Sequence, residues 1–128
     1  MKKKIMFVDD KSDQLFSFEQ VLKESGYHFE FIGVQTGEEC LKKLQHAELP
    51  DIIFLDIMMG EMNGCEVYDK IKDNPAWKEI PIVFLTARKD MLDKIPRECC
   101  GDDVLEKPVD STELFDCINK IIEKNKKE

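Results

Sequence analysis

Five short apolar runs recur along the chain, with amphipathic segments between them. The runs occupy residues 5–8, 29–34, 52–55, 80–85 and 104–105. Short apolar runs that alternate with helical segments are typical of repeated βα units, whose strands lie parallel in one sheet. Runs 5–8, 52–55 and 80–85 are almost continuously apolar, as expected of strands covered by helices on both faces, whereas run 29–34 alternates like an outer strand. The pattern predicts an α/β fold with five strands.

The segments between the runs carry helix signals. Thr36 and Glu39 have the spacing of a capping box, in which a hydroxyl and a carboxylate satisfy the free backbone N–H groups at a helix start. Pro96 is expected to shorten the fourth helix, because proline cannot continue a helical hydrogen-bond pattern. Helices are predicted up to Gly26, between Thr36 and Pro50, between Asn63 and Asn74, between Arg88 and Ile95, and from Asp110 onward.

Length and charge exclude several classes of protein. The 128 residues are the size of one domain, so residues 1–128 are predicted to form a single domain. Nineteen Lys and Arg residues against twenty-seven Asp and Glu give a net charge of −8, which repels nucleic-acid phosphates and anionic lipid headgroups. No apolar run approaches the ~20 residues needed to cross a bilayer. Direct nucleic-acid binding and membrane insertion are therefore not expected.

Five cysteines are an odd number and too few for a disulfide scaffold. Cys40, Cys65 and Cys117 lie on apolar helical stripes and are predicted to be small buried hydrophobic residues. No role follows from the adjacent pair Cys99 and Cys100. A reducing cytoplasm is the simplest setting for such a chain.

Polar functional groups follow four of the five runs. In open parallel sheets, ligands bind beyond the carboxyl ends of the strands. Clustered carboxylates at that edge repel one another unless a cation neutralises them, and oxygen ligands suit Mg²⁺. A carboxylate with a reference pKa of ~3.9 is ionised at neutral pH and can attack phosphorus, while a lysine and a hydroxyl stabilise the transferred oxygens. The groups are Asp9 and Asp10 after the first run, Asp56 after the third, Thr86 after the fourth and Lys107 after the fifth.

These residues and their surroundings resemble the receiver domain of two-component response regulators. The resemblance covers nearly the whole chain and rests on residues 8–10, 56–64, 80–87 and 102–108. It implies a flavodoxin-like, doubly wound fold with a five-stranded parallel sheet in the order 2-1-3-4-5, flanked by five helices. It also implies a phosphoacceptor signalling domain, not an enzyme beyond self-catalysed phosphorylation and dephosphorylation.

The resemblance assigns the acidic residues to phosphoryl transfer and metal binding. Asp56 would accept a phosphoryl group from a histidine kinase or a histidine phosphotransfer protein. Asp10 would bind Mg²⁺ directly, Asp9 through water, and the backbone carbonyl of Met58 would complete the protein contacts together with Asp56. The downstream partner would be a protein that recognises the phosphorylated state.

The remaining roles fall on the strand ends of the second half of the chain. By resemblance, Thr86 and Lys107 would bind the phosphoryl oxygens, and Lys107 would pair with Asp56 before transfer. Met58 and Arg88 would flank the path of an attacking water. Because Met58 is apolar and orients water poorly, we expect self-dephosphorylation to be slow or moderate.

The chain departs from the family pattern at a few positions. Val104 stands where an aromatic residue usually moves inward together with Thr86, so the switch and its output surface are predicted to be atypical. Gly60 replaces a usual proline and Asn63 a common aspartate, changes that affect loop stiffness. Pro108 would follow a cis peptide bond.

Three other functions compete with the switch. A receiver-like interaction module that is never phosphorylated is the main alternative, but it would be expected to lose one of the site residues. A phosphatase with an aspartyl-phosphate intermediate would need a second acid shortly after Asp56, where Ile57, Met58 and Met59 stand. Flavin binding is opposed by the acidic cluster, because a flavin phosphate needs hydrogen-bond donors.

If the chain is full length, we expect a stand-alone receiver. If it is not, its start at Met1 favours an N-terminal domain of a longer protein.

Overall fold

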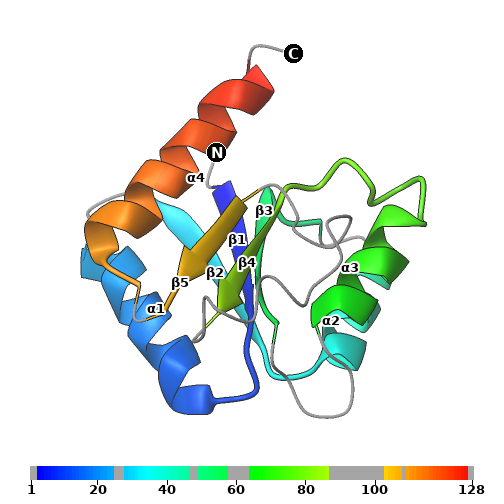
Figure 1. The fold of residues 1–128 in the computed structure, drawn as a ribbon, viewed down its shortest axis with the longest axis horizontal. Coiled ribbons are helices and arrows are strands. Elements are labelled where there is room, and N and C mark those ends of the chain that lie inside the picture. Colours follow the sequence, from blue (N-terminus) through cyan, green and yellow to red (C-terminus); the bar gives the residue numbers. More distant parts are fainter. Residues whose placement is uncertain are drawn as a thin grey trace.

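Five parallel strands form one sheet in the order β2-β1-β3-β4-β5 (Figure 1). The computed structural model describes residues 3–24, 28–46, 49–57, 64–86, 103–107 and 109–126. The doubly wound order predicted for the sheet is confirmed. The strands are β1 (Lys3–Val8), β2 (Phe29–Val34), β3 (Ile52–Asp56), β4 (Ile82–Thr86) and β5 (Asp103–Glu106).

Helices cover both faces of the sheet. Within the described residues they are α1 (Ser12–Glu24), α2 (Gly37–Gln45), α3 (Gly64–Lys72) and α4 (Ser111–Lys126). Residues of α1 and α4 pack together on one face, and residues of α2 and α3 pack on the other. The helix predicted between residues 88 and 95 lies outside the described residues, and α4 corresponds to the fifth predicted helix. Among the described helices, none has the length and apolar character needed to span a bilayer.

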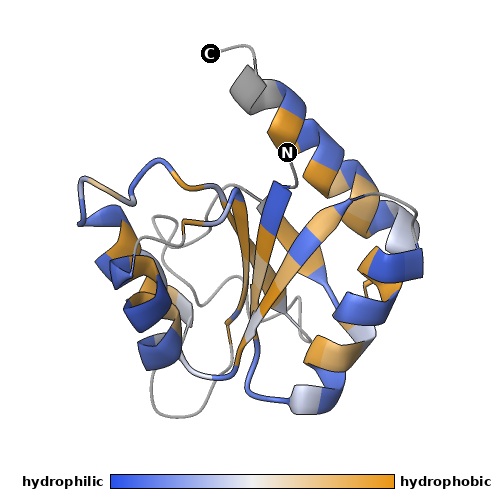
Figure 2. Cartoon of the chain, turned by 180° about the vertical axis from the view of Figure 1, so that it is seen from behind, coloured by the Kyte–Doolittle hydropathy of each residue, from blue (hydrophilic) through white to orange (hydrophobic). Residues whose placement is uncertain are grey.

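Burial of the strands follows their place in the sheet. All five residues of β3 and all five of β4 are buried, whereas β2 at the edge is mostly half-buried or exposed. Successive side chains of a strand point to opposite faces, so β1 sends Ile5 and Phe7 toward α1 and α4, and Met6 and Val8 toward α2 and α3. Figure 2 shows the resulting pattern, with apolar strands enclosed by helices of mixed polarity.

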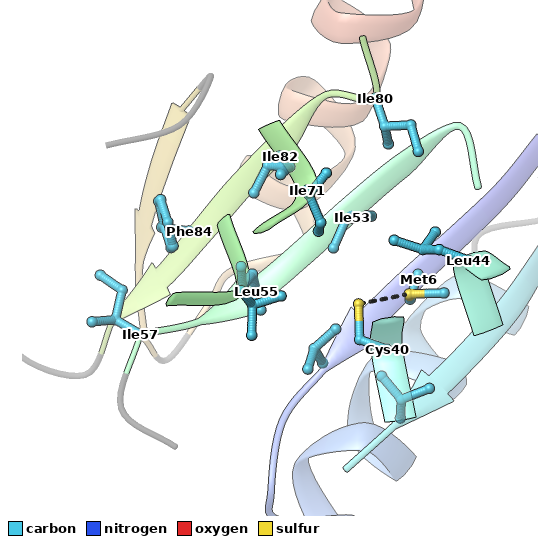
Figure 3. Close-up of a cluster of buried hydrophobic side chains, with 13 residues drawn as sticks. Met6, Cys40, Leu44, Ile53, Leu55, Ile57, Ile71, Ile80, Ile82 and Phe84 are labelled. Carbon is cyan, nitrogen blue, oxygen red and sulfur yellow. Dashed lines mark hydrogen bonds between the residues drawn. The ribbon is translucent and has the colours of Figure 1, made fainter. Parts of the chain in front are cut away.

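The two cores differ in composition. On the α1 and α4 side, the Phe7 ring lies 4.4 Å from the ring of Phe18, 4.7 Å from that of Phe54 and 5.5 Å from that of Phe31. The α2 and α3 side is mainly aliphatic, and there the Cys40 thiol lies 3.7 Å from the Met6 sulfur (Figure 3). Each core therefore includes residues of β1, the strand between β2 and β3.

The cysteines follow the prediction at two of the three helical positions. Cys40 and Cys117 are buried free thiols. Cys65 is only partly buried and is disulfide-bonded, so the prediction that it is a buried hydrophobic residue is wrong. Cys99 and Cys100 lie outside the described residues.

Side-chain caps fix the starts of two helices. Thr36 is the N-cap of α2, and its hydroxyl accepts a hydrogen bond from the Glu39 N–H at 3.0 Å. The Glu39 carboxylate accepts from the Gln35 N–H, one residue before the position expected in a capping box. Asp110 accepts from the Thr112 N–H at the start of α4. The helix starts predicted at Thr36 and Asp110 are confirmed, but α2 ends at Gln45, well before Pro50.

Candidate functional site

Three carboxylates meet at the carboxyl edge of the sheet, the lower edge in Figure 1. Asp9 and Asp10 follow β1, and Asp56 ends β3, the strand beside it. One carboxylate oxygen from each lies within 4.8 Å of the others. Asp9 is 0% exposed and Asp56 is 5% exposed, whereas Asp10 is exposed. The predicted convergence of these three residues is confirmed by their positions.

Lys107 brings a positive charge between two of these acids. Its ammonium nitrogen lies 2.7 Å from Asp9 Oδ2 and 3.2 Å from Asp56 Oδ2. The Lys107 backbone N–H donates to the Thr86 carbonyl at 2.7 Å, which fixes the residue at the end of β5. One ammonium cannot balance three carboxylates, so the cluster keeps an excess of negative charge that a further cation would stabilise.

Both oxygens of Asp9 have partners from the chain itself. Oδ2 accepts from the Lys107 ammonium, and Oδ1 accepts from the Lys11 backbone N–H at 3.0 Å. A carboxylate that bonds the N–H two residues later forms an Asx turn, which leads the chain from β1 into α1. Asp9 therefore combines a structural contact with its place in the acidic cluster.

Thr86 lies at the same edge, at the end of β4, and is 1% exposed. Its neighbour in β5 is Glu106, immediately before Lys107. Val104 pairs with Phe84 across the β4–β5 ladder, is half-buried, and packs against the core on the α2 and α3 side. The structure thus places Thr86 and Lys107 on adjacent strand ends.

Several predicted site residues lie outside the described part of the chain. They are Met58, Arg88 and Pro108, together with the loop positions Gly60 and Asn63. Their predicted roles stay predictions.

Gly64 is a neighbour of the site for which the sequence predicts no role. A methyl group at its Cα would lie 2.6 Å from the carbonyl oxygen of Asp56. The signal in the sequence is a glycine at the start of a helix directly after the loop that follows Asp56.

Cation-supported phosphoryl chemistry suits this arrangement. Carboxylate oxygens at short separation are the ligands that Mg²⁺ prefers, and the partly exposed side of the cluster leaves room for water ligands. A nearly buried carboxylate beside a lysine is arranged as a nucleophile with a charged group ready to stabilise developing oxyanions.

Known proteins share both the sequence pattern and the fold. A family model described as the response regulator receiver domain matches residues 5–119. The chain is 33% identical over 126 residues to the alkaline phosphatase synthesis transcriptional regulatory protein PhoP of Bacillus subtilis (strain 168), covering 98% of this chain and 50% of that protein. It is 33% identical over 116 residues to Protein PilG of Pseudomonas aeruginosa, covering 90% of this chain and 84% of that protein.

Solved structures agree with this assignment. The crystal structure of a CheY-like response regulator receiver domain protein from Methanospirillum hungatei JF-1 matches with a TM-score of 0.85 at 25% identity, covering 100% of both chains. A putative response regulator from Chloroflexus aurantiacus J-10-fl matches with a TM-score of 0.84 at 29% identity, covering 94% of this chain and 98% of the other. The chain spans about half the length of the first curated relatives it matches. From its strand order, its acidic edge and these matches, the chain belongs to the response regulator receiver domain family.

Proposed function

We propose that this chain is a phosphorylation-dependent switch that accepts a phosphoryl group on Asp56. The observation that carries the proposal is the Lys107 ammonium held between Asp9 and Asp56 inside a cluster of three carboxylates. Burying the Asp56 carboxylate at the open edge of the sheet costs free energy, and a purely structural role does not explain that cost. Receiver domains are signalling domains, so the proposed donor is the phosphohistidine of a histidine kinase or a histidine phosphotransfer protein.

We assign Mg²⁺ to the three carboxylates, with the backbone carbonyl of Met58 as a further predicted ligand. When bound, Mg²⁺ neutralises the excess negative charge and lowers the repulsion between an incoming phosphoryl group and the site. Asp10 is the exposed member of the cluster and can accept a hydrated ion from solvent. Asp9 already holds two hydrogen bonds from the chain, which favours a contact through water for this residue.

The proposed transfer uses groups of this chain at each position. An oxygen of the Asp56 carboxylate attacks phosphorus, so an O–P bond forms while the N–P bond of the donor histidine breaks, and the imidazole leaves with the electron pair. The Lys107 ammonium lies beside Asp56 before transfer. It then pairs with the negatively charged phosphoryl oxygens. The Thr86 hydroxyl donates a hydrogen bond to the same oxygens, which stabilises the transferred group.

The proposed output is a change at the face around β4 and β5. Movement of Thr86 toward the phosphoryl group would act on the β4–β5 ladder, in which Val104 pairs with Phe84, two residues before Thr86, and packs against the core. A branched aliphatic side chain has no ring to move between buried and exposed positions, so we propose an output surface that differs from the usual one. The partner at this surface is a protein, in keeping with the net charge of −8.

Return to the resting state is proposed to be slow or moderate. We assign Met58 and Arg88 to the path of the attacking water, where an apolar side chain gives that water little orientation. The rate of decay of the phosphorylated form is thus expected to depend on Met58.

The deciding experiment is the intact mass of the protein after incubation with acetyl phosphate, with and without Mg²⁺. We expect a gain of one phosphoryl group that requires Mg²⁺ and is abolished by Asp56→Asn. Asp51→Asn is a matched control, because Asp51 lies at the opposite end of β3 and bonds the Lys4 N–H. A folded protein with no gain under any condition would favour the interaction-module alternative.

A further inference from the structure

We propose that Gly64 is a positioning residue for the phosphoacceptor, because the absence of a side chain there lets α3 press against the backbone of Asp56. The inference rests on the proposed phosphorylation of Asp56. It assigns a role in that reaction to a residue that has no reactive group of its own.

The contact is with backbone atoms, which yield less easily than a flexible side chain. A methyl group on Gly64 would lie 2.6 Å from the Asp56 carbonyl oxygen, 3.2 Å from its carbonyl carbon and 3.0 Å from Ile57 Cα. Ordinary contact begins at 3.4 Å, so the oxygen alone would have to move from 2.6 to 3.4 Å, a shift of about 0.8 Å.

Hydrogen bonds hold this stretch of backbone on both sides. The Gly64 N–H donates to the Ile57 carbonyl at 3.0 Å, which ties the start of α3 to the end of β3. The Ile57 N–H donates to the Leu85 carbonyl at 3.1 Å, which ties the same residue to β4. The peptide that joins Asp56 to Ile57 is therefore held between a helix and a strand.

The elements on either side have little freedom to give way. Val67 and Ile71 of α3 are 0% exposed and pack in the core with Phe84. Every residue of β3 is buried between β1 and β4. A methyl group at residue 64 would thus displace the backbone of Asp56, whose carboxylate must stay beside Lys107.

A displacement of this size matters more for transfer than for binding. A misplacement of ~1 Å at a reacting group can cost about 100-fold in rate. Because the donor would still reach the site, the loss should appear in the maximal rate and leave the half-saturating donor concentration near its wild-type value.

Gly33→Ala provides a matched control. It makes the same chemical change at the edge strand β2, where the added methyl would meet the ring of Phe31 at 2.9 Å. The atoms that it would approach belong to side chains of Phe31 and Leu15, neither of which is among the site residues.

The test compares phosphorylation by acetyl phosphate in the wild type, Gly64→Ala and Gly33→Ala, with donor and Mg²⁺ varied to saturation. We expect Gly64→Ala to lower the maximal rate by about 10- to 100-fold, while Gly33→Ala keeps the wild-type rate. Each rate is divided by the folded fraction from circular dichroism, and sucrose, which favours the folded state, is added to all three samples if Gly64→Ala is destabilised.

The outcomes separate this inference from the proposed function. A wild type that is never phosphorylated would overturn both. A wild type that reacts, with an equal maximal rate for folded Gly64→Ala, would overturn only the role of Gly64. A variant that stays unfolded even in sucrose would make Gly64 a folding requirement and would overturn its role in positioning.

Discussion

The ammonium group of Lys107 lies between two carboxylates that water barely reaches. The side chains of Asp9 and Asp56 are 1% and 7% exposed, and that of Lys107 is 10% exposed. Charges removed from water need a partner, and deleting one member of a buried pair leaves the other uncompensated. The resting site therefore depends on Lys107 for its stability as well as for its proposed chemistry.

We predict that Lys107→Met lowers the free energy of unfolding by about 3 kcal/mol when divalent ions are chelated. Excess Mg²⁺ should restore part of this loss, because an ion among the carboxylates takes over the neutralising charge and binds only the folded state. The measurement is urea unfolding with chelator and with Mg²⁺.

Lys70→Met is the control for this substitution, because Lys70 is exposed on α3 and is expected to have little effect. An equal loss for Lys107→Met in chelator and in Mg²⁺ would contradict the idea that the ion and the lysine neutralise the same carboxylates.

Among the helices, α2 shows how one residue sets the start of an element. The Thr36 hydroxyl accepts from the Glu39 N–H, one of the backbone donors that has no partner within the helix. We predict that Thr36→Ala lowers the free energy of unfolding by about 1 kcal/mol, whereas Thr36→Ser keeps the hydrogen bond and most of the stability. Urea unfolding of both variants checks this. Equal losses in the two variants would mean that the methyl group, not the hydroxyl, stabilises this position.

The elements were predictable where a local pattern determines them. Strand β2 was predicted with its observed bounds, and the predicted run 52–55 lies within β3, because continuous or alternating apolar residues decide burial in a sheet. Helix ends were less predictable, since α2 ends at Gln45 and Pro50 only sets a limit beyond which no helix can continue.

The site was predictable in membership but not in its contacts. The convergence of Asp9, Asp10 and Asp56 follows from parallel strands that end at one edge. The shorter distance from Lys107 to Asp9 than to Asp56 depends on how side chains pack, and no local pattern encodes it. The close approach of Gly64 to Asp56 likewise arises from residues that meet only after the sheet and α3 pack together.

At the scale of the whole molecule, stability comes from two cores separated by the sheet, and the core on the α2 and α3 side holds the Cys40 thiol. Cys40 is 0% exposed and packs with Met6 and Leu44 in the aliphatic core (Figure 3). Burial, with a smaller contribution from the charge of Glu39, raises the pKa of the Cys40 thiol from 9.0 to about 12. The neutral thiol fits this core and the thiolate does not.

This raised pKa predicts how the stability of the whole domain changes in alkaline solution. Well below pH 9.0 the thiol is protonated in both states, and the full contribution of the buried thiol is present. As pH rises from 9.0 toward about 12, the unfolded chain loses this proton while the native state keeps it, so the free energy of unfolding falls. Cys40→Ala removes this dependence but leaves a small cavity, which makes the variant less stable than the wild type at neutral pH. Urea unfolding of both proteins at several pH values below and above 9.0 checks this. The wild type should lose its advantage in free energy of unfolding over Cys40→Ala as pH rises. A constant difference in free energy of unfolding would mean that the native state accommodates the thiolate.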